Sequence, residues 1–153
     1  MRARAESSDF EPVYFVEGFL DGVLNGTADY RGAPHHFLLC AAEPNAPEVY
    51  QLTPLSPEVF SAVTEAWEIW RRWQQAQCAT PTPASTLLAA LPEDRQRQAE
   101  LRGFISNSLA AAKPLAFQAE GDFEQVASDA ATERVVPYSL RVRWTKLDQN
   151  RDI

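Results

Sequence analysis

The two neighbouring histidines, His35 and His36, are the only imidazoles in the chain. On a strand, successive side chains point to opposite faces, so the two rings cannot chelate one ion together. His36 and Cys40 share a face, but four residues of strand separate them by about 13 Å. The chain has neither a C-x-x-C nor an H-E-x-x-H motif, and these are the usual zinc-site signatures. We therefore expect no metal and no cofactor.

Pairs of carboxylates offer a second kind of chemistry. Glu17 with Asp21, and Glu120 with Asp122, are spaced to share strand faces, but acid/base catalysis needs one member buried so that its pKa rises. Both pairs fall on faces predicted to contact solvent, which favours charged surface rows. Nucleophile and phosphate-loop motifs are absent from the sequence as well, so the sequence favours a protein that is not an enzyme.

Three tryptophans, Trp67, Trp70 and Trp73, are the most conspicuous aromatic cluster. They could form an aromatic box for a ligand or cation. All three also fall on the apolar arc of an amphipathic helix, which makes packing in a core the favoured interpretation.

Hydrophobic periodicity predicts the elements that carry these residues. Residues 16–31 alternate as one long, glycine-rich strand, followed by a turn at 31–34 and strands at 35–42 and 49–52. Amphipathic helices are expected at 57–77, after the helix-start signal Ser56-Pro57, and at 92–112. Strands at 115–123 and 136–145 form a final hairpin in which Arg141 and Arg143 face Glu120 and Asp122.

This order, β-β-β-α-α-β-β, predicts an α+β fold in which two helices cover one face of an antiparallel sheet of about five strands. Residues 1–12 are expected to be a flexible leader, 13–146 a single domain, and 147–153 a flexible tail. A chain of 153 residues suits one such domain.

Composition excludes several classes of partner. The net charge of −7 argues against binding to nucleic acid, and no apolar run approaches the length of about 18 residues that a membrane span needs. Two cysteines do not make a disulfide framework, which favours a reducing cytoplasm. Arginine greatly outnumbers lysine and alanine is frequent, a composition typical of a bacterium with a GC-rich genome.

Acidic residues gather in two segments. Residues 1–30 hold six acidic and two basic side chains, and residues 114–134 hold five and one. The leading hypothesis is therefore a non-catalytic bacterial interaction protein, such as an immunity protein, an antitoxin-like inhibitor or an adaptor. Its acidic surface would bind a basic protein partner through Glu17, Asp21, Asp29, Asp129 and Glu133.

One alternative is a small-molecule-binding protein or a hydrolase. Its pocket would lie between sheet and helices and be lined by His35, His36, Trp67 and Trp70. A homodimer joined at a strand edge is compatible with either function.

Overall fold

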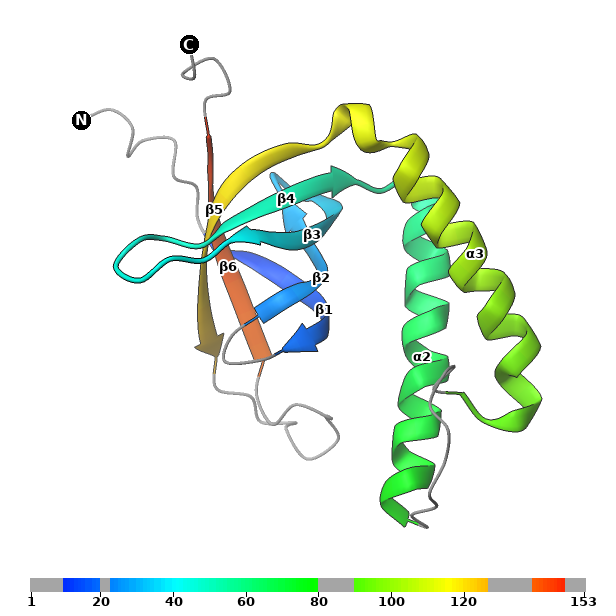
Figure 1. The fold of residues 1–153 in the computed structure, drawn as a ribbon. Coiled ribbons are helices and arrows are strands. Elements are labelled where there is room, and N and C mark those ends of the chain that lie inside the picture. The colour runs from blue at the N-terminus through cyan, green and yellow to red at the C-terminus, as the bar shows by residue number, and fades with distance from the viewer. Residues whose placement is uncertain (1–9, 20–22, 80–89, 127–138, 148–153) are drawn as a thin grey trace. The chain divides into compact units, whose positions relative to one another are not determined.

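The computed structural model describes residues 10–19, 23–79, 90–126 and 139–147 (Figure 1). The chain divides into two compact units, one formed by Met1–Leu55 with Ala112–Ile153 and the other by Ser56–Ala111. We call them the barrel unit and the helical unit and describe each by itself. The domain predicted at 13–146 thus contains two units. Glu11 and Pro12, which the sequence assigned to a leader, begin the first strand.

The described residues of the barrel unit form six antiparallel strands that pair in chain order and close into a barrel. The first and last strands meet through two residue pairs, Glu11 with Val142 and Pro12 with Arg141. The strands are β1 (Glu11–Phe19), β2 (Val23–Tyr30), β3 (Ala33–Ala41), β4 (Val49–Pro54), β5 (Phe117–Val126) and β6 (Ser139–Lys146).

The predicted α+β class with an antiparallel sheet and two helices is confirmed, but the sheet has six strands and is closed. The long strand predicted at 16–31 is wrong, because this segment contributes two strands, paired from Val13 with Ala28 to Phe19 with Val23. Glycines at even positions continue the two-residue periodicity from one strand into the next, so the alternation alone did not indicate a boundary between β1 and β2. Asp21-Gly22 is itself a hairpin dipeptide that could have marked it.

The turn expected near residue 31 is confirmed as a two-residue connection between β2 and β3. Arg31 and Gly32 both have positive φ, 55° and 79°, as a type I′ hairpin turn requires. Their backbone N–H groups donate to the two carboxylate oxygens of Glu11, at 2.8 and 2.9 Å. The first residue of β1 therefore holds this turn in place.

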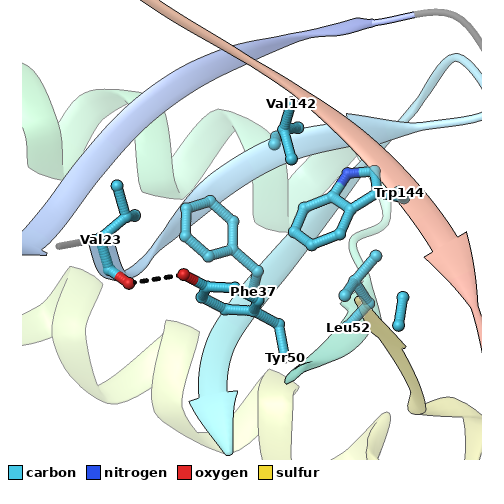
Figure 2. Close-up of a cluster of buried hydrophobic side chains, with 8 residues drawn as sticks. Val23, Phe37, Tyr50, Leu52, Val142 and Trp144 are labelled. Atoms are coloured by element: carbon cyan, nitrogen blue, oxygen red, sulfur yellow. Dashed lines mark hydrogen bonds between the residues drawn. The ribbon is translucent and has the colours of Figure 1, made fainter. Parts of the chain in front are cut away.

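Aromatic rings fill the barrel. Phe37, Tyr50 and Trp144 are almost completely buried, and their ring centroids lie 5.7–5.8 Å apart. Figure 2 shows these rings with Leu52 and Val142, and with the hydroxyl of Tyr50 donating to the carbonyl oxygen of Val23 at 2.8 Å. Gly121 makes room for the cluster, because a Cβ atom there would lie 2.7 Å from the Trp144 ring.

The helical unit contains α2 (Pro57–Ala79), a short 3₁₀ turn η1 (Pro92–Asp94) and α3 (Arg95–Ala111). The predicted helix start is confirmed: Pro57 is the first helical residue, and the hydroxyl of Ser56 accepts from the N–H of Val59 at 3.2 Å. Arg97 donates twice to Glu65, at 2.8 Å each. The buried residues of this unit's core are Ala62, Ala66, Ile69, Ala90 and Leu101.

Candidate functional site

The acidic residues chosen from the sequence fall into three groups. Glu17 is exposed on β1. Asp21, Asp129 and Glu133 lie outside the described residues. Asp29 is described, and it is buried.

Asp29 was expected on a polar strand face, but only 8% of its surface is exposed. Its carboxylate accepts from the hydroxyl of Tyr14 at 2.9 Å, and its backbone oxygen accepts from the indole N–H of Trp144 at 2.9 Å. Burial and this carboxylate raise the pKa of Tyr14 to about 12. Period-2 alternation predicts that every second residue of a strand is exposed, but residues 26–29 of β2 are all buried. The sequence pattern therefore predicted the wrong environment for Asp29. Asp29 therefore joins strands to one another and is not part of an exposed docking surface.

Barrel closure brings other carboxylates together. In a closed antiparallel meander, β1, β3 and β5 end where β2, β4 and β6 begin. Glu17 and Glu124 lie near this end on β1 and β5, while Glu43 and Glu48 belong to the connection between β3 and β4. We call these four residues the acidic end.

The β3–β4 connection gives the acidic end a defined shape. The N–H of Ala46 donates to the carbonyl oxygen of Glu43 at 3.3 Å, and Asn45 has a φ of 67°. Proline at the second position and a positive φ at the third are typical of a type II turn. The carboxylate of Glu48 contacts the hydroxyl of Tyr50 at 3.0 Å, while residues 40–47 are exposed.

Ion pairs cover the outer face of β5 and β6. Arg143 pairs with Asp122 at 3.3 Å, as predicted, but Arg141 pairs with Glu124. The register explains the difference, since it sets Glu120 opposite Thr145. Phe10 packs on the same face. The guanidinium groups of Arg141 and Arg143 lie over its ring, at 4.2 and 4.5 Å from the ring centroid.

The two histidines lie side by side on β3 and face opposite sides, as predicted. The Nδ1 atom of His35 lies 2.8 Å from the carbonyl oxygen of Ala33. Burial lowers the pKa of His35 and of His36, so both rings favour the neutral form. Among the described residues, no group of three or more His, Cys, Asp and Glu side chains could hold a metal ion.

Aromatic and basic side chains surround His35 at the end of the barrel opposite the acidic end. The rings of Tyr30, His35 and Phe117 contact one another, with centroids 4.9–5.8 Å apart. The ammonium of Lys146 lies 4.9 Å from the Phe117 centroid. We call Tyr30, His35, Phe117 and Lys146 the barrel mouth. Sequence reasoning identified only His35 of this set, because the strand register that joins the four is not local.

The tryptophans of the alternative pocket belong to the helical unit. Trp67 and Trp70 stack at 5.0 Å with an interplanar angle of 28°, and both are half-buried on α2. Since His35 and His36 belong to the barrel unit, a pocket lined by all four residues stays a prediction.

Comparisons with other proteins add no assignment to this geometry. In the described parts of the chain, no helix is both long enough and apolar enough to cross a membrane. No protein-family model, no curated protein and no solved structure matches this chain.

Proposed function

We propose that this chain is a non-catalytic interaction protein, an inhibitor or adaptor, that binds a basic protein partner at the acidic end of its barrel. The observation that carries the proposal is the strand topology, which sets Glu17, Glu43, Glu48 and Glu124 at one end. The sequence alone distributes these four carboxylates over more than a hundred residues.

The charges of the acidic end are only partly compensated. Glu124 is paired with Arg141, whereas Glu43 and Glu48 have no ion-pair partner within the described residues. An uncompensated carboxylate group attracts a basic surface over roughly a Debye length, about 8 Å at physiological salt. Such attraction mainly raises the rate of association and selects partners of opposite charge.

The proposal keeps the bacterial cytoplasm as the location and leaves Asp21, Asp129 and Glu133 as further candidate contacts. Asp29 no longer belongs to it, since its carboxylate is buried and accepts from the hydroxyl of Tyr14. A homodimer also stays a prediction.

The test is affinity capture of partners from a bacterial lysate with two double variants. Glu43→Gln with Glu48→Gln removes two charges from the acidic end, and the glutamine amide can still form a hydrogen bond with the hydroxyl of Tyr50. Glu58→Gln with Glu68→Gln removes two charges from exposed positions on α2. Both proteins therefore have the same net charge but differ in where the charge was lost.

We expect the wild-type protein and the α2 double variant to retain the same basic protein at low salt. The acidic-end double variant should retain it several-fold less, because each lost surface charge costs up to about 1 kcal/mol. Equal retention by the two double variants would contradict the proposal, as would capture of no basic protein.

A further inference from the structure

The strand register places an imidazole, a phenyl ring and an ammonium on the inner face of the sheet at the barrel mouth. His35 pairs with Ala28, Phe117 with Leu52, and Lys146 with Ala119. Each of these partners is a core residue, and directly paired residues point to the same side of a sheet. His35, Phe117 and Lys146 therefore form the last interior layer of the barrel.

Two cations, Lys146 and Arg31, border this layer. Lys146 lies over Phe117, and the guanidinium of Arg31 lies 5.6 Å from the centroid of Tyr30. Within the described residues, neither cation forms an ion pair. Two carboxylates also act on His35: Glu11, which accepts from the turn amides, and Asp29, which accepts from Tyr14.

The imidazole of His35 adds a directed acceptor. A carbonyl oxygen can only accept, so Nδ1 carries the proton that is donated to Ala33, and the neutral ring leaves Nε2 as an acceptor. Nε2 has no hydrogen-bond partner in the described structure, and it is not among the fully enclosed polar atoms that lack one. The acceptor lone pair of Nε2 is therefore unused, on a residue of which 8% of the surface is exposed.

We propose that the barrel mouth binds a small, flat organic carboxylate that also carries a hydroxyl group. The carboxylate would meet Lys146 and Arg31, the flat body would lie against the rings of Tyr30 and Phe117, and the hydroxyl would donate to Nε2 of His35. Mouths of β-barrels are recurrent sites for small ligands that combine apolar contact with a few polar groups. This site is independent of the acidic end, which lies at the other end of the barrel.

The test uses 4-hydroxybenzoate as the probe and 4-hydroxybenzamide as its uncharged counterpart. The chain has only two histidines, so an NMR titration followed at the imidazole Hε1 protons gives one resonance from each, and a His36→Gln variant assigns them. We expect 4-hydroxybenzoate to shift the His35 signal in a saturable manner and to leave His36 unchanged, because His36 points away from the interior. The amide probe should shift neither signal.

Two charge variants identify the contacts. Lys146→Gln should weaken binding of 4-hydroxybenzoate about fivefold, the change expected for loss of one exposed ion pair. Arg102→Gln on α3 removes an exposed charge from the helical unit and should change nothing. The proposal fails if the amide binds as well as the carboxylate, if both histidines or neither shift, or if Lys146→Gln binds like the wild type.

Discussion

At the scale of single residues, the barrel interior depends on how closely one glycine lets the rings approach. A Cβ atom on Gly121 would lie 2.7 Å from the Trp144 ring and 3.0 Å from the Tyr50 ring. Both rings are nearly fully buried and contact each other, so neither can move without disturbing the cluster. The small residue is thus part of the packing and not a flexible point.

We predict that Gly121→Ala lowers the free energy of unfolding by about 1–3 kcal/mol, the cost of overpacking a filled core. The measurement is urea denaturation, followed by the fluorescence of the tryptophans. Gly103→Ala is the matched control, because a Cβ atom there meets nothing within 4 Å and Gly103 lies within α3. The control should raise stability by up to about 1 kcal/mol, as alanine favours helix. Equal effects of the two substitutions would contradict this account of the core.

At the scale of elements, the beginning of β1 closes the barrel. Among the described residues, two pairs join β1 to β6. The same short segment places the Glu11 carboxylate on the β2–β3 turn and Phe10 beneath two guanidinium groups. Side-chain contacts thus reinforce a seam that has few backbone pairs.

We predict that Glu11→Ala destabilises the protein by about 1–2 kcal/mol, because two charge-assisted hydrogen bonds are lost at a partly exposed site. Amide hydrogen exchange should become faster at Arg31 and Gly32, whose N–H groups lose their acceptor. Glu43→Ala, at an exposed loop position, should leave both amides protected. Unchanged exchange at Arg31 and Gly32 in Glu11→Ala would refute this role for Glu11.

Helices and hairpins that are determined by neighbouring residues could be predicted from the sequence, whereas the closure of the six strands into a barrel could not. The helix at 57–77 carries its own cap and a clean apolar arc, and the pair Asp122–Arg143 belongs to one hairpin. The contact of Glu11 with residues 31 and 32, and the pairing of β1 with β6, join segments that lie far apart in the chain. The mouth and the acidic end both follow from that closure, so periodicity alone could not reveal them.

At the scale of the whole molecule, the buried His35 and the half-buried His36 couple folding to pH. Burial holds the pKa of His35 and of His36 below the usual value of 6.5, so the folded state binds protons more weakly than the unfolded chain. The stability of the neutral form is therefore fully present above pH 6.5 and decreases as the pH falls below it.

We predict a lower free energy of unfolding at pH 5.5 than at pH 7.5, measured by urea denaturation at both values. Each histidine contributes a slope of at most about 1.4 kcal/mol per pH unit. His36→Gln should reduce the loss, because one titrating ring is removed. The opposite trend, greater stability at pH 5.5 that His36→Gln abolishes, would show that the rings are stabilised as cations.

The distribution of charge is the second property of the whole barrel. Closure separates Glu43 and Glu48 at one end from Arg31 and Lys146 at the other. Our proposals assign a different kind of partner to each end: a basic protein surface to the acidic end, and a small anion to the mouth. The net charge of −7 hides this difference between the two ends.

The most direct test of the acidic end measures the rate of association with the captured partner as a function of ionic strength. For the wild-type protein and for Glu58→Gln with Glu68→Gln, we predict a rate that falls steeply with salt, as expected for electrostatic steering. For Glu43→Gln with Glu48→Gln, the rate should be lower at low salt and its salt dependence shallower. The same salt dependence in all three proteins would contradict docking at the acidic end.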